Sequence, residues 1–180
     1  MNIKIWQTFH DWQVARDAIC SRRYGVIETS GGRFVAIHFR PWPKLLAWPE
    51  IWPVGSNYHV RGKADQCLLY FNQPMMHSRY LALKYLVSTF GTSSATVLAA
   101  MTMLDAVAKL KRSDAILCDV ANARFSDRLI SRMGWQSHKP QRWHRNYIKR
   151  FYGVYPELRL PLPAEQAIEV RSPVASMIVS

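Results

Sequence analysis

Three helices are predicted from apolar residues that recur at every third or fourth position. The clearest covers residues 94–111, where these residues form one broad stripe and polar residues lie between them. Residues 10–23 and 124–133 repeat the pattern, and each segment is followed by a glycine that favours a helix end, Gly25 and Gly134. Each predicted helix therefore has one side suited to packing against a core.

Strands are predicted where apolar residues alternate or form short runs between turn residues. Gly31 and Gly32 separate two such runs, as in a tight β-hairpin. Residues 78–88 fit two structures, because Leu81 and Leu83 alternate as in a strand while the leucine-rich composition also permits a helix. The other predicted strands cover residues 2–9, 24–29, 33–39, 67–71 and 115–120, with a further strand-like stretch around 143–148.

A stretch rich in proline and aromatic residues follows the predicted hairpin. It contains three Trp-Pro pairs, at Trp42, Trp48 and Trp52, which exclude a continuous central strand. These rings either cover the core or form an aromatic lid over a substrate. Prolines also punctuate residues 156–180, so we expect a single domain over residues 1–155 followed by a C-terminal tail.

The predicted elements of residues 78–151 have the order strand, loop, long helix, strand, helix, strand. A strand–helix–strand crossover implies two parallel strands with a right-handed connection. In such sheets, ligands bind where strand ends meet the amino ends of helices. We therefore expect an α/β fold with a pair of parallel strands and a site at the start of the helix over residues 94–111.

Composition and charge favour a globular protein with an anionic partner. The 180 residues are 49% hydrophobic and 20% charged, which argues against wholesale disorder. Lysine and arginine outnumber aspartate and glutamate by 24 to 12. The net charge of +12 favours nucleic acid, a nucleotide-bearing cofactor or an acidic surface as partner, although a general basic bias explains it equally simply.

The spacing of cysteine and histidine predicts neither a disulfide framework nor a metal site. Cys20, Cys67 and Cys118 are far apart and form no CxxC pair, and the histidines show no ligand spacing. We expect free thiols in a reducing compartment. The first residues lack the basic and apolar stretches of a secretion signal, and no apolar stretch is long enough to span a membrane. The sequence therefore predicts a cytoplasmic protein.

The loop before the long helix is the first candidate site. Small residues let backbone amides approach an anion, and the positive end of the helix dipole adds to this attraction. A plain helix cap at Ser93 or Ser94 explains the same residues. The loop consists of Ser88, Thr89, Phe90, Gly91, Thr92, Ser93 and Ser94.

This loop and the residues after it resemble the GNAT superfamily of acyl-CoA N-acyltransferases. That family has a Gln/Arg-x-x-Gly-x-Gly/Ala loop, a helix, a strand, an Asn that begins the next helix, and a Gly-Phe pair that ends it. The resemblance covers roughly residues 78–152, less than half of the chain, and residues 1–77 carry no matching motif. The matching features are Ser88-x-x-Gly91-x-Ser93 for the loop, Asn122 after the strand, and Gly134-Trp135 after the second helix.

The resemblance implies a three-layer, mixed α/β domain in which helices flank a central mixed sheet that is splayed between the strands ending near Val87 and Val120. It also implies a protein that binds acetyl-CoA or another acyl-CoA and transfers the acyl group directly to an amine. It implies that the loop from Ser88 to Ser93 binds the pyrophosphate. The main chain of Val87 would pair with the pantetheine arm, and Asn122 would orient the cofactor or the substrate.

The chain departs from the family at the groups that transfer protons. Residues 78–88 contain no Glu or Asp to act as a general base, and Leu129 or Ile130 stands where many members have a tyrosine acid. An acid or base then has to come from elsewhere, although a structural role is the more common one for such residues. The nearest candidates are Tyr147 and Tyr152, followed by His138 and His144.

A basic and aromatic segment gives an alternative function, a GNAT-like module that has lost catalysis and binds nucleic acid or another partner. Cations that hold phosphates and aromatic rings that stack on bases are typical of surfaces for RNA or single strands. A solvated helix face beside core aromatics explains the segment equally well. The candidate contacts are Arg124, Arg128, Lys139, Arg142, Arg145, Lys149 and Arg150.

Overall fold

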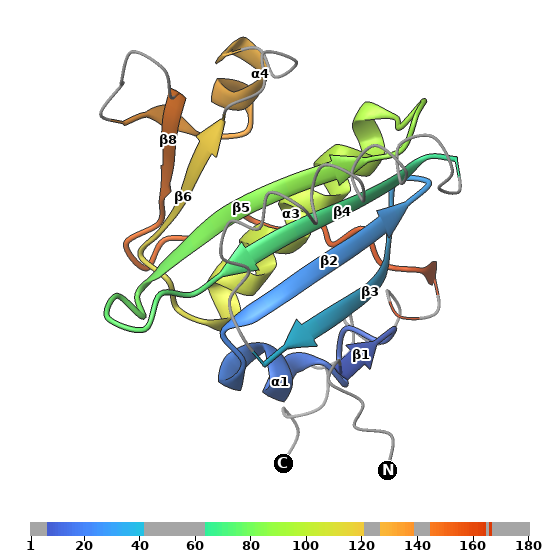
Figure 1. Cartoon of the computed structure of the whole chain (residues 1–180), viewed down its shortest axis with the longest axis horizontal. Coiled ribbons are helices and arrows are strands. Elements are labelled where there is room, and N and C mark those ends of the chain that lie inside the picture. Colours follow the sequence, from blue (N-terminus) through green and yellow to red (C-terminus); the bar gives the residue numbers. More distant parts are fainter. Residues whose placement is uncertain (1–6, 42–63, 121–126, 139–144, 165, 167–180) are drawn as a thin grey trace, which may run out of the picture.

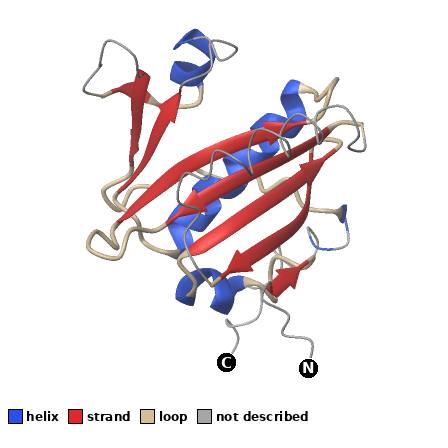
Figure 2. Ribbon diagram, in the orientation of Figure 1, coloured by secondary structure: helices blue, strands red, loops and turns tan. Residues whose placement is uncertain are grey.

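The computed structural model describes residues 7–41, 64–120, 127–138, 145–164 and 166. Within these residues, eight strands form one sheet in the order β1-β3-β2-β4-β5-β6-β8-β7 (Figures 1 and 2). The Trp-Pro pairs lie outside the described residues. In chain order the elements are β1 (Gln7–Phe9), α1 (Arg16–Ser21), β2 (Tyr24–Ser30), β3 (Arg33–Arg40), β4 (Gln66–Asn72), β5 (Tyr80–Ser88), α3 (Ser94–Leu110), β6 (Ala115–Val120), α4 (Asp127–Arg132), β7 (Gln136–Ser137) and β8 (Arg145–Arg150).

The sheet is mixed, as predicted. β5 and β6 are parallel and are joined through helix α3, whereas the other neighbouring strands of the described sheet are antiparallel. The order of elements expected for residues 78–151 is confirmed, and so is the mixed α/β class that the GNAT resemblance implied. Residues 80–88 form a strand because their backbone groups pair with β4 on one side and, in the first part, with β6 on the other.

Strands β5 and β6 separate partway along their length. Their pairing runs from Tyr80 opposite Ala115 to Leu83 opposite Cys118 and then ends. β5 stays paired with β4 as far as Ser88, and β6 stays paired with β8 along its whole length. The sheet is therefore splayed, as expected (Figure 1). We call the separated part, beyond Leu83 and Cys118, the β5–β6 opening.

A β-bulge accompanies this separation. The register between β4 and β5 shifts so that Lys84 is an extra residue between Leu83 and Tyr85. The burial pattern of β5 changes at the same point: Leu81 and Leu83 are buried, and no later residue of the strand is. A bulge bends and twists its strand, so it favours the divergence of β5 from β6.

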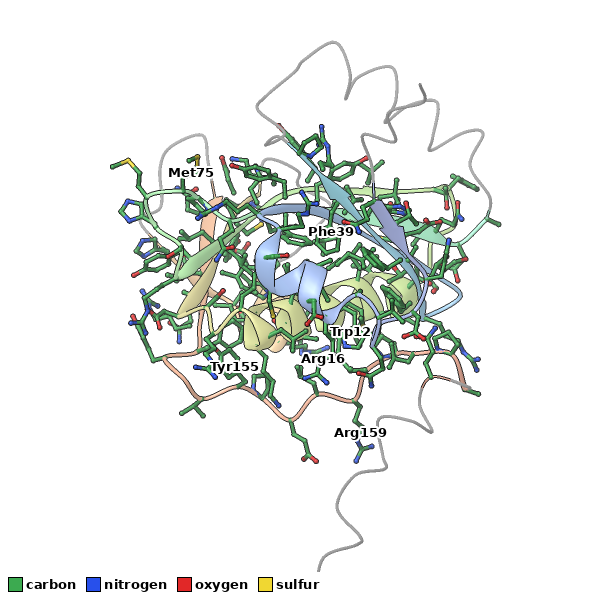
Figure 3. All side chains as sticks on the ribbon, turned by 90° about the horizontal axis from the view of Figure 1, so that it is seen from below. Trp12, Arg16, Phe39, Met75, Tyr155 and Arg159 are labelled. Atoms are coloured by element: carbon green, nitrogen blue, oxygen red, sulfur yellow. The ribbon has the colours of Figure 1, made fainter. Side chains whose placement is uncertain are left out.

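The core lies between the sheet and the helices α1 and α3, which pack on the same face (Figure 3). Helix α3 contributes its apolar stripe, in which Met103, Leu104 and Val107 are fully buried. Ile27 of β2 and Leu69 of β4 belong to the same cluster. Apolar surface removed from water stabilises a fold by about 25 cal/mol per Å², so this face anchors the long helix whose start borders the opening.

Helix α1 is shorter than predicted. The apolar period predicted a helix over residues 10–23, whereas the structure has an α-helix only at Arg16–Ser21. Residues 12–15 form turns instead, and Asp11 Oδ1 accepts hydrogen bonds there from the amides of Gln13 at 2.6 Å and Val14 at 3.3 Å.

The end of helix α4 follows the prediction. Gly134 has a φ of +83°, a left-handed conformation that glycine adopts readily. The amide of Trp135 donates to the carbonyl of Ile130 at 3.3 Å, which satisfies a carbonyl at the end of the helix. The predicted start of this helix, at residue 124, lies outside the described residues.

Part of the segment expected to be a C-terminal tail contacts the domain. The carbonyl of Pro161 accepts a hydrogen bond from the amide of Phe34 at 2.6 Å, and Leu162 is buried in the core. The side-chain oxygen of Gln166 accepts a hydrogen bond from the amide of Trp12 at 3.3 Å. These contacts cover the helical side of the molecule, away from the opposite face of the sheet (Figure 3).

Candidate functional site

The loop predicted to bind an anion lies at the end of the β5–β6 opening, where it leads from β5 into α3 (Figure 1). Two threonines hold it against the start of β4. The amide of Thr89 donates to the carbonyl of Gln66 at 3.0 Å, and Thr89 Oγ1 accepts a hydrogen bond from the Gln66 amide at 2.9 Å. Thr92 Oγ1 donates to the same carbonyl at 2.9 Å. These bonds fix the loop relative to the sheet.

Ser93 caps helix α3, which was one of the two explanations of the loop. Its Oγ accepts a hydrogen bond from the amide of Thr96 at 3.2 Å. Its own amide donates to Asp65 Oδ1 at 2.7 Å, and its hydroxyl donates to Asp65 Oδ2 at 3.2 Å. The bond from the Ser93 amide, followed by one from the Thr96 side chain, lowers the pKa of Asp65. A carboxylate of the chain itself therefore lies at the amino end of α3.

Two further amides lie at this helix end. Ser94 and Ala95 are exposed, and the hydrogen bonds made within the described part of the chain do not use their amide groups. Gly91, just before them, has a φ of +74°, and the side chain of Phe90 is 79% exposed. An external anion can reach these groups, with Asp65 as a negatively charged neighbour.

The end of β5 presents one strand edge to the opening. Val87 and Ser88 pair with Leu68 and Cys67 of β4, and neither is paired with a residue of β6. The resemblance implies that pantetheine binds along this edge. Asn122, which it implies as the orienting side chain, lies outside the described residues, two positions after the end of β6.

Tyr147 lies close to the opening, on β8 opposite Cys118. Its hydroxyl donates to Asp127 Oδ1 at 2.5 Å, and Arg145 donates to the same oxygen at 2.8 Å. Burial, followed by the hydrogen bond to Asp127, raises the pKa of Tyr147, while the same hydrogen bond lowers the pKa of Asp127. A raised pKa makes this hydroxyl a weaker acid, and the contact joins α4 to β8.

Tyr152 lies at the other end of β6 and β8. Its amide donates at 3.2 Å to the carbonyl of Asp114, just before β6 begins, and its side chain is exposed. At about 3.3 Å per strand residue, this end lies roughly 20 Å from Val120. The structure therefore brings Tyr147, and not Tyr152, to the opening. His138 lies just beyond β7, where its amide bonds to β8.

Among the described residues, the basic side chains have different environments. Lys149 donates to Asp105 at 2.6 Å, and the two side chains are only 13% and 10% exposed. Lys149 therefore joins β8 to α3 inside the protein. Arg145 and Arg150 donate to neighbouring side chains, and Arg128 is exposed on α4. The remaining predicted residues, Arg124, Lys139, Arg142 and His144, lie outside the described residues.

A polar cluster on the sheet was not predicted from the sequence. His38 Nε2 lies 3.1 Å from Glu28 Oε2, and Gln66 Nε2 donates to Glu28 Oε1 at 3.3 Å. Thr8 Oγ1 lies 2.9 Å from His38 Nδ1. One signal was available, because Glu28 and His38 are ionisable residues within two predicted strands. The hairpin of β2 and β3 was predicted, whereas the pairing of β2 with β4, which brings Gln66 to Glu28, is not visible in the local pattern.

Comparison with known proteins gives a distant similarity. No protein-family model matches the chain, and no curated protein matches it. Among solved structures, the chain is similar to nourseothricin acetyltransferase, with 11% sequence identity and a TM-score of 0.39, over 82% of this chain and 99% of that one. A similarity of this size carries no argument about activity, so the chain's own geometry has to define the site.

No described helix combines the length and apolarity that a membrane span requires. The described residues also contain no group of His, Cys, Asp and Glu side chains arranged to hold a metal ion.

Proposed function

We propose that the chain is an acyl-CoA-dependent N-acyltransferase that moves an acetyl or other small acyl group directly to an amine. The supporting observation is the β5–β6 opening, where the edge of β5 at Val87 has no partner in β6 and lies beside the start of α3. An open strand edge can bond to an extended, amide-containing chain. The helix start adds amides and partial positive charge for phosphate groups.

Two features of the described residues favour binding of an acyl-CoA, and one disfavours it. Ser94 and Ala95 are exposed residues whose amides are not used in the hydrogen bonds of the described residues, and a Cβ at Gly91 would meet nothing within 4 Å, so the turn leaves space for a ligand. Asp65 opposes an anion through its charge. We therefore assign the phosphates to the side of the helix end that Ser94 and Ala95 form, away from the Asp65 carboxylate.

In this assignment, the main chain of Val87 bonds to the pantetheine arm, and the loop from Ser88 to Ser93 lies along the pyrophosphate. Asn122 orients the cofactor or the substrate. Bound acyl-CoA supplies an electrophilic thioester carbonyl. The amine nitrogen bonds to that carbon as the C–S bond breaks, and the proton lost by the nitrogen balances the proton gained by the thiolate.

Direct transfer of the acyl group, without a cysteine-bound intermediate, agrees with the protonated thiols of the two cysteines near the opening. Burial raises the pKa of Cys118 to about 12, and it raises the pKa of Cys67 to about 12 as well. A thiol with such a pKa is protonated at neutral pH and is a poor nucleophile. Tyr147, on β8 opposite Cys118, acts as a proton donor only after its hydroxyl leaves Asp127.

Titration calorimetry with acetyl-CoA and longer acyl-CoAs tests the proposal. We expect at least one to bind, with free CoA competing for the same site. A thiol-release assay with a panel of primary amines then tests transfer. If no acyl-CoA binds, the proposed acyltransferase activity is contradicted.

A second candidate function is binding of nucleic acid without catalysis. The net charge of +12 favours it, although Lys149 is already used inside the protein. Filter binding to RNA and DNA over a salt series separates the two functions. A steep loss of affinity with salt supports nucleic-acid binding, and absence of binding at low salt excludes it.

A further inference from the structure

Polar side chains from four neighbouring strands are linked across the sheet. Thr8 of β1 contacts His38 of β3 at 2.9 Å, His38 contacts Glu28 of β2 at 3.1 Å, and Gln66 of β4 donates to Glu28 at 3.3 Å. We call Glu28, His38 and Gln66 the sheet-face cluster. Each oxygen of the Glu28 carboxylate is thus held by a different neighbouring strand.

The sheet-face cluster lies on the face opposite helices α1 and α3. Ile27 and Ile37 are opposite one another in the β2–β3 pair and belong to the core on the helical face. Side chains alternate along a strand, so the next residues, Glu28 and His38, point to the other face. Their side chains are each 21% exposed, so the cluster is not sealed in the core.

The cluster is in line with the β5–β6 opening. Glu28 is opposite Leu68 in the β2–β4 pair, and Leu68 is opposite Val87 in the β4–β5 pair. Directly opposite residues point to the same face. At about 4.8 Å per strand, the Glu28 carboxylate therefore stands roughly 10 Å across the sheet from the edge at Val87.

Two tyrosines lie between the cluster and the opening. Tyr70 and Tyr85 are opposite one another in the β4–β5 pair, and their rings meet edge to face with centroids 6.4 Å apart. Tyr70 is also opposite Val26, which lies two residues before Glu28 on the same face of β2, so this row adjoins that of the carboxylate. A carboxylate beside aromatic rings is a combination that binds ammonium groups through charge and cation–π attraction. Arg40 is a cation two residues from His38 on β3. Strand β3 is farther from the opening than β2, so Arg40 does not lie between Glu28 and the opening.

We propose that the sheet-face cluster binds the acyl acceptor and that this acceptor is a polyamine, with one ammonium group held by Glu28 and a second amino group about 10 Å away at the β5–β6 opening. The inference rests on the proposed acyltransferase function for the role of that second group. His38 and Gln66 are positioning residues, because they hold the two carboxylate oxygens in place. The charge of +12 disfavours polycations at long range, so the acceptor is recognised by local contacts.

Calorimetry with spermidine, in the absence of acyl-CoA, tests the amine site on the full chain. Spermidine should bind more tightly than putrescine, and ethylamine least, because only a long polyamine reaches both ends of the site. Glu28→Gln should weaken spermidine binding by about tenfold or more. Glu157→Gln, which neutralises an exposed glutamate outside the sheet, is the matched control and should leave the affinity unchanged.

A second variant, His38→Gln, keeps the test valid if Glu28→Gln does not fold. His38→Gln keeps a hydrogen-bonding side chain beside Glu28 and should weaken spermidine binding less than Glu28→Gln does. Circular dichroism verifies the fold of each variant. Absence of spermidine binding, or equal binding by the unmodified protein, Glu28→Gln and His38→Gln, would overturn the amine site.

Separate titration with acetyl-CoA distinguishes failure of the amine site from failure of the proposed function. Binding of acetyl-CoA without binding of spermidine would remove only the polyamine acceptor. Spermidine binding that requires Glu28, without binding of any acyl-CoA, would support the amine site and remove the acyltransferase function. Thiol release from acetyl-CoA that depends on spermidine and is lost in Glu28→Gln supports both.

Discussion

The carboxylate of Asp65 accepts two hydrogen bonds from Ser93, one from its amide at 2.7 Å and one from its hydroxyl at 3.2 Å. The carbonyl of Asp65 also accepts a hydrogen bond from the amide of Gly31 at 3.2 Å. Asp65 has a φ of +54°, which residues other than glycine seldom adopt. One residue therefore joins the start of α3, the turn between β2 and β3, and the beginning of β4.

We expect Asp65 to contribute a pH-dependent part of the stability. Its folded-state pKa is lowered, so its contribution is present above the pKa of the unfolded chain and is lost as the pH falls through the folded-state value. Asp65→Asn should lower the melting temperature at neutral pH and change it little in strong acid. Thermal unfolding across this pH range checks the expectation, with Glu157→Gln as control. An equal loss at every pH would contradict it.

The same substitution should tighten the binding of acetyl-CoA. Asp65→Asn removes a negative charge next to the amides assigned to the phosphates, and one surface charge is worth a few-fold in affinity, on the order of 1 kcal/mol or less. Calorimetry at low and high salt measures the effect, which should shrink as the salt concentration rises. Unchanged or weaker binding would contradict phosphates bound at the start of α3.

Substitutions of Lys149 and Asp105, which form an ion pair, should have strongly non-additive effects on the free energy of unfolding. Burial raises the pKa of Asp105, and the charge of Lys149 opposes this by lowering it. Lys149→Met or Asp105→Leu alone leaves a buried charge without its partner, at a loss of about 3–5 kcal/mol in the free energy of unfolding. The double substitution should recover most of that loss. Urea unfolding of all four proteins measures the coupling, and simple additivity would count against it.

Gly25 is required by the ring of Phe71. A Cβ at this position of β2 would lie 2.5 Å from Cζ of the fully buried Phe71, its partner in β4. Gly25→Ala should therefore reduce the free energy of unfolding by about 1–3 kcal/mol. Adding Phe71→Leu should restore part of the loss, because the shorter side chain leaves room. A neutral Gly25→Ala would show that the ring moves aside without penalty.

Local periodicity predicted the half of the fold that borders the site. The stripe of α3, the strand at Ala115–Val120 and the glycine that ends α4 were all visible, because each depends on residues within a few positions of one another. The splay between β5 and β6 was expected only through the family resemblance. It is confirmed by pairing that ends at Leu83 and Cys118.

Long-range pairing was not predictable in the same way. Strand β4 lies beside β2 and not beside β3, although β3 is nearer in sequence. That register brings Glu28 and Gln66 together and places Asp65 at Ser93. The turn made by Asp11 was also missed, because the apolar period continued through it. The sequence predicted the type of most elements, but it did not predict which distant residues contact one another.

The amide of Ser94 offers the most direct test of the cofactor site. Ser93 has φ −70° and ψ 153°, an extended conformation that suits a following proline, and the first helical position tolerates proline well. Ser94→Pro therefore removes this amide while α3 stays intact. Ser94→Ala removes the hydroxyl and keeps the amide.

The decisive measurement is the dissociation constant of acetyl-CoA for the unmodified protein, Ser94→Pro and Ser94→Ala, determined by calorimetry under one set of conditions. We expect Ser94→Ala to bind like the unmodified protein and Ser94→Pro to bind about tenfold more weakly, as the loss of a hydrogen bond to a charged group implies. Equal affinities in all three proteins, or no binding by the unmodified protein, would contradict a cofactor site at the start of α3.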